Sequence, residues 1–248
     1  MNIYSPQLPL FKRYKCLFGS VIVLEGNIGV GKTTAGASMV IYLNSIGLRA
    51  KFFPEPVCLP LLNQYQKNMK KYAYSFQIIM AKERIQIYKD AWKFAKKGGI
   101  SIIDRSLMGD YTFALMQYEK GFFTDSEWNV YLKLLEHDRK FDPDFILYLE
   151  CTPEKAYERM IDRGRPGEKE GYTLEYFQDL NEAYEKSLNT ISGNIGRLNW
   201  NDDLKVKIKL STSSELNLIN SKTNLSIQRL SDEVCQKFLD LIKQNLTS

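Results

Sequence analysis

The sequence predicts an α/β fold in which helices flank a parallel β-sheet. Three short apolar runs rich in β-branched residues, 20–25, 100–104 and 145–150, have the composition of strands buried on both faces. Two less regular strand candidates are 49–53 and the alternating segment 206–210. Helical stretches separate these runs. Because strands that alternate with helices build parallel sheets, the order predicts one such sheet.

Helices are expected between the strands and at the C-terminus. The helical stretches are 33–46, 74–97, 107–120, 125–140, 153–163, 174–190 and 230–246. The first is followed by Gly47, a residue type that favours the left-handed position after a helix. The fifth begins with Thr152 as N-cap and Pro153 in the first turn, both typical of helix starts.

Two polar stretches interrupt the pattern near the C-terminus. Residues 191–203 are rich in Gly and Asn, and residues 211–226 are rich in Ser, Asn and Thr. Both are expected to be loops rather than a domain boundary. We therefore expect one domain over 1–248, with a polar insertion at about 191–226.

Composition excludes several classes of protein. The chain has 248 residues, of which 44% are hydrophobic and 25% charged, as in globular proteins. No apolar run reaches the ~18 residues of a membrane span, and the N-terminus lacks the apolar core of a secretory signal. Four scattered cysteines and one histidine provide no zinc cluster and indicate a reducing compartment. We expect a cytoplasmic location, with a mitochondrial one as the alternative. The net charge of +5 suits a polyanionic small molecule or a nucleic acid.

The most specific motif is the segment 26–33, Gly-Asn-Ile-Gly-Val-Gly-Lys-Thr, between a predicted strand and a predicted helix. Backbone N–H groups of such a loop wrap phosphate oxygens. Lys32 would reach the terminal phosphates, and the Thr33 hydroxyl would ligate Mg²⁺. The predicted ATP-binding residues here are Gly26, Asn27, Ile28, Gly29, Val30, Gly31, Lys32, Thr33 and Thr34. The alternatives are a glycine-rich turn without a ligand and a dinucleotide-binding loop, and the glycine spacing disfavours the latter.

Charged residues follow two of the predicted strands, where parallel sheets place their chemistry. Glu55 lies between two prolines after 49–53, and a carboxylate near the phosphates can deprotonate a hydroxyl acceptor. Asp104 suits a second ligand for Mg²⁺, and Arg105 suits a clamp on the transferring phosphoryl group. The alternatives are a solvated loop glutamate for Glu55 and a helix N-cap for Asp104.

Arginines recur near the end of the helix 153–163. Arg159 and Arg163 are spaced to form one basic stripe, and Arg165 follows directly after Gly164. The stripe alone is typical of a solvated, salt-bridged helix face. The glycines that follow it favour a mobile arginine-bearing lid over a triphosphate, at about 159–171.

In this order, the phosphate loop, Glu55-Pro56-Val57, Phe76-Gln77, Asp104-Arg105-Ser106 and the arginine segment resemble the deoxynucleoside kinase family over about 20–190. The resemblance implies a P-loop kinase fold and transfer of the γ-phosphoryl group of ATP, with Mg²⁺, to the 5′-hydroxyl of a deoxyribonucleoside. Nucleotide salvage is the implied role, and a homodimer the implied assembly. Neither nucleic acid nor a membrane is expected as a partner.

The resemblance also assigns roles to residues. Glu55 corresponds to the general base, and Arg105 to the arginine that orients the 5′ oxygen. Asp104 stands where the family usually has a glutamate, and would help to hold Mg²⁺ with Thr33. Arg159, Arg163 and Arg165 correspond to the lid.

Further substrate contacts follow from the same resemblance. Gln77 corresponds to the residue that hydrogen-bonds the base edge. Arg84 and Asp110 resemble a pair found in the purine and cytidine kinases, which implies preference for deoxyadenosine, deoxyguanosine or deoxycytidine over thymidine. The alternative places Arg84 on the surface beside Glu83 or Tyr88.

Several positions depart from the family. The tryptophan that usually follows Glu-Pro-Val is missing. Tyr65, one residue off in spacing, is the candidate for the 3′-hydroxyl, and Phe113 for stacking on the base. The lid glutamate is Glu168 or Glu170, because this lid is one residue longer.

Three other functions share part of this pattern. A thymidylate-type nucleoside monophosphate kinase shares the phosphate loop and an Asp-Arg pair, but usually has Asp-Arg-Tyr and lacks Glu-Pro-Val. A non-catalytic nucleotide-binding subunit of the same fold does not need Lys32, Thr33, Glu55 and Arg105, which are all present. A nucleic-acid ATPase has only the mild positive charge in its favour.

Overall fold

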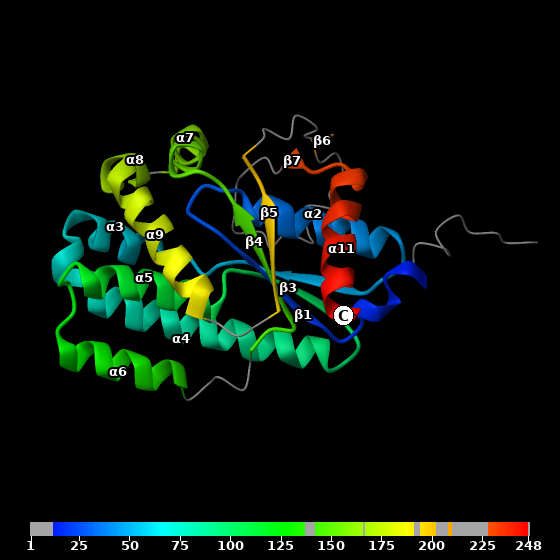
Figure 1. The fold of residues 1–248 in the computed structure, drawn as a ribbon, viewed down its shortest axis with the longest axis horizontal. Coiled ribbons are helices and arrows are strands. Elements are labelled where there is room, and N and C mark those ends of the chain that lie inside the picture. Colours follow the sequence, from blue (N-terminus) through cyan, green and yellow to red (C-terminus); the bar gives the residue numbers. More distant parts are fainter. Residues whose placement is uncertain are drawn as a thin grey trace, which may run out of the picture.

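The computed structural model describes residues 12–136, 142–165, 167–190, 194–201, 208–209 and 228–247. Its centre is a parallel sheet with the strand order β2-β3-β1-β4-β5 (Figure 1). The strands are β1 (Val21–Glu25), β2 (Ala50–Phe53), β3 (Ile100–Asp104), β4 (Phe145–Glu150) and β5 (Ile195–Asn199). The predicted α/β class is therefore confirmed.

The two central strands carry the apolar runs that the sequence shows. Every residue of β1 and β3 is buried, as expected for strands covered on both faces. Their register pairs Leu24 with Asp104. The ends of both strands therefore lie side by side, and the loops that follow them start from the same edge of the sheet.

Helices cover both faces of the sheet (Figure 1). The helices, with one short 3-10 turn η1 (Lys15–Leu17), are α2 (Lys32–Ser45), α3 (Leu59–Lys67), α4 (Met69–Ala95), α5 (Leu107–Glu119), α6 (Asp125–Glu136), α7 (Pro153–Arg163), α8 (Glu168–Gly171), α9 (Leu174–Thr190) and α11 (Asp232–Thr247). On one face α2 packs against α11, and on the other α4 packs against β3 and β1. Helix α5 lies between α4 and α9. Within the described residues, none of the helices has the length and apolar character needed to cross a membrane.

The buried side chains form one hydrophobic cluster that extends along the sequence from Tyr14 to Ile242. Successive side chains along a strand point to opposite faces of the sheet. Ser101 points to α4, where its hydroxyl donates to the Ala91 carbonyl (2.8 Å). Phe52 points to α2, where its ring lies against Gly36. A side chain at position 36 would collide with that ring.

The region before α4 differs from the sequence prediction. Residues 59–67 form α3, which was not expected, with a proline in its first turn. Helix α4 begins at Met69 rather than at 74, because the Asn68 side chain accepts a hydrogen bond from the Lys71 amide (3.1 Å) and caps it. The last residues of the helix predicted over 125–140, with His137, lie outside the described residues.

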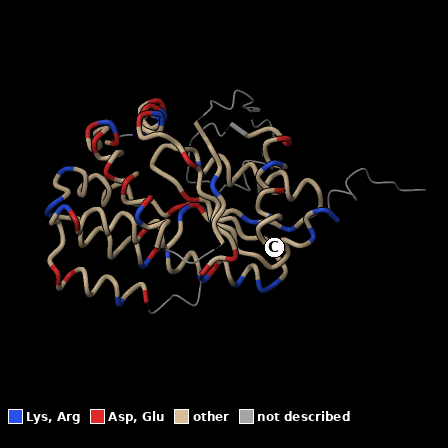
Figure 2. The backbone as a smooth tube through the Cα atoms, viewed as in Figure 1, with Lys and Arg blue, Asp and Glu red and all other residues tan. Residues whose placement is uncertain are grey.

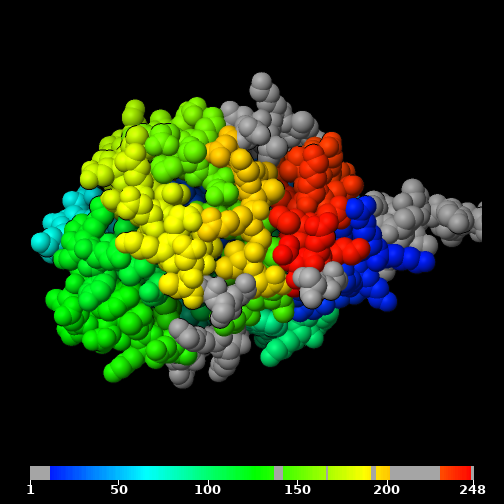
Figure 3. Space-filling model, in the orientation of Figure 1, coloured from blue at the N-terminus to red at the C-terminus, as the bar shows by residue number. Residues whose placement is uncertain are grey.

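The predicted loop over 191–203 is wrong for residues 195–199. These residues form β5, which pairs with β4 and lies at the surface between α9 and α11 (Figure 3). Its polar composition suits an edge strand. Gly196 gives the Phe145 ring room, since a Cβ there would lie 2.6 Å from the ring.

The strand predicted over 206–210 does not extend the main sheet. Its described part, β6 (Ile208–Lys209), pairs antiparallel with β7 (Gln228–Arg229). Residues 202–207, 210–227 and 191–193 lie outside the described part of the chain, and so does most of the predicted insertion.

Candidate active site

The predicted site residues of β1, β2 and β3 gather at the carboxyl edge of the sheet. Basic and acidic residues occur together where these strands lead into the following segments (Figure 2). The phosphate loop follows β1, and Glu55 follows β2. Asp104 is the last residue of β3, and Arg105 comes directly after it. The strand order places β1 and β2 on either side of β3, so their loops meet.

The phosphate loop has the conformation that its glycines permit. Gly26, Gly29 and Gly31 all have positive φ angles. A Cβ at Gly29 would lie 2.3 Å from the Ala156 carbonyl oxygen, so the loop packs closely on α7. Helix α2 begins directly afterwards, at Lys32. The predicted arrangement of strand, loop and helix is therefore confirmed.

Lys32 is buried at the centre of this loop. Its ammonium group donates to the carbonyl oxygens of Gly26 (2.9 Å) and Asn27 (2.8 Å). Burial and the nearby Arg105 charge lower the pKa of Lys32 to about 8. These two carbonyl groups therefore hold the Lys32 ammonium inside the phosphate loop.

Asp104 and Thr33 meet beside the phosphate loop. The Thr33 hydroxyl donates to Oδ2 of Asp104 (2.5 Å). The other carboxylate oxygen, Oδ1, is buried and has no hydrogen-bond partner in the structure. Burial raises the pKa of Asp104. The N-cap alternative for Asp104 is wrong, because Ser106 caps α5 by accepting from the Gly109 amide (2.8 Å).

This pair offers two oxygen ligands to a cation. A carboxylate and a hydroxyl suit Mg²⁺, which takes its remaining ligands from phosphate and water. In the described part of the chain, no group of three or more His, Cys, Asp or Glu side chains is placed to hold a metal ion. The donor set therefore fits a metal that arrives with a nucleotide, rather than one held by protein alone.

Glu55 lies between two arginines. Its Oε1 accepts from Nη2 of Arg84 (2.5 Å) and from Nε of Arg105 (2.9 Å). Burial alone raises the pKa of Glu55, but the Arg105, Arg84 and Lys32 charges outweigh it and lower that pKa to about 2. The Glu55 side chain is only 26% exposed. The solvated-loop alternative for Glu55 is therefore wrong.

Arg105 has an unusual backbone conformation. Its φ is 75°, the one positive value among the non-glycine residues that the structure describes. Such strain costs roughly 1–3 kcal/mol and is typical of functional sites. The backbone amide donates to the Leu24 carbonyl (2.9 Å), and the guanidinium lies 4.7 Å from the centroid of the Phe113 ring. Phe113 thus supports Arg105 through a cation–π contact.

Arg84 and Asp110 form a buried ion pair, so the surface alternative for Arg84 is wrong. Asp110 is held from two further sides. The Tyr131 hydroxyl donates to its Oδ1 (2.7 Å), and the Gln77 side-chain amide donates to its backbone carbonyl (3.1 Å). Tyr131 was missed by sequence reasoning, because α6 is far from the motifs along the chain and no local pattern marks it.

Tyr65 lies on α3 in a wall of aromatic residues. Its ring stacks on Phe76 with 4.6 Å between centroids. Its hydroxyl accepts from the Gln117 side chain (3.1 Å) and lies 3.4 Å from the Tyr176 hydroxyl. Burial raises the pKa of Tyr65 to about 12. The hydroxyl therefore stays protonated.

The lid residues are joined by ion pairs and carbonyl contacts. Glu168 is buried and accepts from Arg163 through both oxygens and from Arg165 (3.2 Å), whereas Glu170 is exposed. Arg159 donates to the carbonyls of Trp200 (2.9 Å) and Val30 (3.4 Å), and so connects α7 with the phosphate loop. Of the two candidate lid glutamates, Glu168 lies among the arginines.

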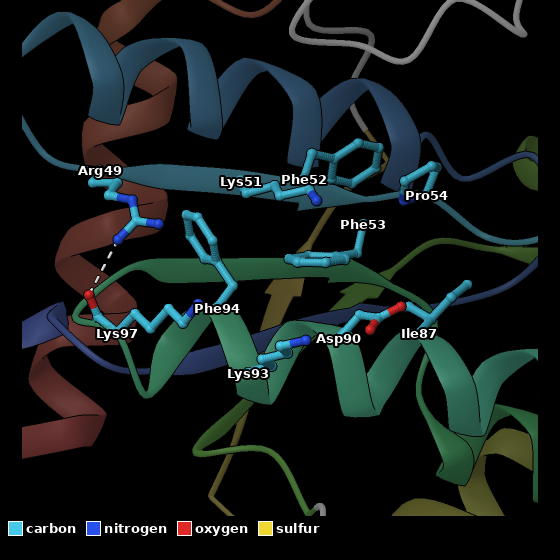
Figure 4. Close-up of a pocket in the computed structure, with 10 residues that line it drawn as sticks. All are labelled: Arg49, Lys51, Phe52, Phe53, Pro54, Ile87, Asp90, Lys93, Phe94 and Lys97. Carbon is cyan, nitrogen blue, oxygen red and sulfur yellow. Dashed lines mark hydrogen bonds between the residues drawn. The ribbon is translucent and has the colours of Figure 1, made fainter.

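A groove of about 450 Å³ opens between β2 and α4 (Figure 4). The Arg49 guanidinium lies 4.5 Å from the Phe94 ring centroid, and the Lys51 ammonium lies 4.7 Å from that of Phe53. The groove contains none of the predicted site residues, although Pro54 in its lining directly precedes Glu55.

Comparison with known proteins decides the family. The family model described as deoxynucleoside kinase matches residues 22–240. The chain belongs to the deoxynucleoside kinase family. It is 34% identical over 205 residues to a deoxyadenosine kinase of Dictyostelium discoideum, covering 81% of this chain and 80% of that one. It is 26% identical to deoxycytidine kinase 2 of Gallus gallus, covering 92% and 90%.

A solved structure agrees. The deoxyadenosine kinase from M. mycoides with bound dCTP superposes with a TM-score of 0.63 at 26% identity, covering 82% of this chain and 97% of that one. The P-loop kinase fold is therefore confirmed. As a deoxynucleoside kinase, the protein is a phosphotransferase that uses ATP and a hydroxyl acceptor on a deoxynucleoside. The monophosphate-kinase and binding-subunit alternatives find no support.

Proposed function

We propose that this kinase phosphorylates the 5′-hydroxyl of deoxyadenosine, deoxyguanosine or deoxycytidine in preference to thymidine, for nucleotide salvage. The observation that carries the proposal is the buried Arg84–Asp110 pair, which lies directly beside Glu55. A nucleobase that contacts this pair lies against a guanidinium cation and an adjacent carboxylate. Adenine, guanine and cytosine have an amino donor next to a ring acceptor, whereas thymine has no exocyclic amino group and carries a methyl group.

The reaction is proposed to depend on positioning and charge. Glu55 accepts the proton of the 5′-hydroxyl as general base, and its low pKa keeps it ionised at neutral pH. Arg105, which contacts Glu55, stabilises charge on the transferring group. Lys32 and the loop 26–33 hold the ATP phosphates, with Thr34 and the lid residues Arg159, Arg163 and Arg165 around them.

The nucleoside is proposed to lie along the wall formed by α3, α4 and α5. Gln77 hydrogen-bonds the base edge, Phe113 packs on the base, and Tyr65 lies near the sugar. Glu168 is favoured over Glu170 as the lid contact to the sugar, because Glu168 is buried beside Arg163 and Arg165 and Glu170 is exposed.

Mg²⁺ is proposed to enter with ATP and to bind Thr33 and Asp104. The buried, unpartnered Oδ1 of Asp104 supports this, because such an oxygen is costly unless it gains a partner. The ion, when bound, offsets negative charge on the phosphate oxygens. The protein's part is to hold Asp104 and Thr33 beside the loop.

The proposed assembly is a homodimer, with neither nucleic acid nor a membrane as partner. Ile79 on α4 and Val130 on α6 are large apolar side chains exposed by 41% and 52%. The two helices contact each other, so these side chains belong to neighbouring elements that a second copy can cover. Analytical ultracentrifugation tests the dimer. A monomer at micromolar concentration would contradict it.

Residues 1–248 are proposed to form one kinase domain, since the single buried cluster extends from Tyr14 to Ile242. No disulfide joins the four cysteines, all of which lie in the described part of the chain. The cytoplasmic location, with the mitochondrial alternative, stays a prediction.

The test of base preference is the ratio of kcat/KM values for the four deoxynucleosides with ATP and Mg²⁺. We expect deoxyadenosine, deoxyguanosine or deoxycytidine to give the largest value. Thymidine as the best substrate would contradict the proposal.

A further inference from the structure

Glu25, the last residue of β1, has a buried carboxylate that the proposed mechanism does not use. It accepts hydrogen bonds from the backbone amide of Gly26 (3.2 Å) and from the amide and hydroxyl of Ser106. It thereby connects the start of the phosphate loop to the turn after β3. A carboxylate held in this way is fully paired, as burial of a charge requires.

A tyrosine on α9 connects the same carboxylate to Arg105. The Tyr184 hydroxyl donates to Oε2 of Glu25 (2.9 Å) and accepts from Nη1 of Arg105. A hydroxyl has one proton, so donating it to Glu25 turns the oxygen lone pairs toward the guanidinium. Oε2 of Glu25 also lies 3.7 Å from Nη1 of Arg105.

Arg105 is therefore held from two sides. Glu55 contacts its Nε, while Tyr184 and Glu25 contact its Nη1. Its backbone has a positive φ, which L-residues avoid, so surrounding contacts must offset that strain. The Phe113 ring and the Gly26 carbonyl (3.4 Å) also contact the guanidinium, but only Tyr184 and Glu25 place a hydroxyl and a carboxylate at its Nη1.

The space around Glu25 is closely fitted to this arrangement. A Cβ at Gly109 would lie 2.2 Å from Oε1 of Glu25, so the first turn of α5 approaches the carboxylate as only glycine allows. The arrangement thus involves β1, the first turn of α5 and α9, which are far apart in sequence.

We propose that Glu25 and Tyr184 are positioning residues that hold the Arg105 guanidinium in its productive orientation. The proposal rests on the proposed role of Arg105. It assigns a function to a buried carboxylate and a buried hydroxyl outside the motifs that carry the nucleotide and the nucleoside.

The test begins with Tyr184→Phe, which removes one hydroxyl and keeps the ring in its packing. Losing a hydrogen bond to a charged group should lower kcat by about 10-fold or more, with KM for both substrates changed by less than about 2-fold. The control is Tyr148→Phe. The Tyr148 ring packs on Tyr184 with 5.5 Å between centroids, but Tyr148 does not bridge Glu25 and Arg105. Its kcat should stay near wild type.

The decisive measurement repeats Tyr184→Phe in an Arg105→Lys background. If Tyr184 acts through Arg105, the second change should lower kcat by less than about 2-fold. Fully multiplicative losses, or an unchanged kcat in the single Tyr184→Phe variant, would overturn the proposal. Glu25→Gln should show the same dependence on Arg105, and its thermal unfolding midpoint reports separately on folding. If Arg105→Lys alone leaves kcat unchanged, the proposed function of Arg105 fails instead.

Discussion

Arg84 and Arg105 donate to the same oxygen of Glu55, Oε1, at 2.5 Å and 2.9 Å. One arginine belongs to the wall that we assign to the base, and the other to the end of the site near the phosphate loop. In the proposed mechanism, Glu55 would therefore connect the side chain that selects the nucleoside with the side chain that assists phosphoryl transfer. Both contacts depend on an ionised carboxylate, which the neighbouring cations maintain.

Replacing Glu55 with Gln removes the proposed general base. The amide keeps the shape but cannot accept a proton, so we expect kcat to fall by about 10²-fold or more. KM for the nucleoside should change much less. Steady-state kinetics check this, and an unchanged kcat would show that another group accepts the proton.

Asp104→Asn should lower activity and raise stability. Because burial raises the pKa of Asp104, the charged form destabilises the folded state at neutral pH, and a neutral side chain removes that cost. We also expect a higher Mg²⁺ concentration for half-maximal rate. Urea unfolding at pH 7 and a Mg²⁺ titration of the rate are the measurements. A less stable variant with an unchanged Mg²⁺ requirement would contradict the assignment.

Because of Lys32, both the stability and the activity of the protein should depend on pH in the alkaline range. Its pKa is lowered from 10.5 to about 8, so the unfolded chain holds this proton more tightly than the folded one does. The free energy of unfolding should therefore rise between pH 8 and 10.5 relative to a Lys32→Met variant. Over the same range kcat/KM for ATP should fall, because the ammonium charge is lost. The prediction is contradicted if the difference in free energy of unfolding between the wild type and Lys32→Met is the same at every pH.

Replacing Arg84 and Asp110 together should relax base selection. The double change Arg84→Gln with Asp110→Asn avoids leaving one buried charge unpaired, which single changes would do. We expect the kcat/KM ratio of deoxyadenosine, deoxyguanosine and deoxycytidine to thymidine to fall by about 10-fold or more. An unchanged ratio would mean that the pair only supports the fold.

The lid offers a matched pair of variants. Glu168→Gln weakens the contacts to Arg163 and Arg165, so KM for the substrates should rise several-fold. Glu170→Gln changes an exposed side chain two residues away and should leave the kinetics near wild type. Equal effects of both changes would rule out a specific role for Glu168.

Local patterns were enough to predict the sheet and the phosphate loop. The apolar run of β1 and the glycines after it specify both a buried strand and a phosphate cradle. The edge strand β5 was not predictable in the same way, since a polar strand with a glycine has the composition of a loop until β4 is beside it. Helix α3 was not predicted because it starts close to the prolines around Glu55, and proline is unfavourable inside a helix.

The site residues that belong to a local sequence motif could be predicted from the sequence. Asp104 ends a strand, Arg105 and Glu55 follow strands, and such side chains meet at the carboxyl edge of a parallel sheet. Tyr184, Tyr131 and Gln117 were missed because their partners lie in other elements, and tyrosine or glutamine in a helix has no distinctive pattern. Glu25 had a signal, a carboxylate at the end of a buried strand, which the adjoining phosphate loop obscured.

The most direct test is the identity of the phosphoryl acceptor. Radiolabelled γ-phosphate ATP with Mg²⁺ should label the 5′-position of deoxyadenosine, deoxyguanosine or deoxycytidine, and the Glu55→Gln variant should lose most of this transfer. Transfer only to a nucleoside monophosphate, or to thymidine in preference to the other three, would contradict the account.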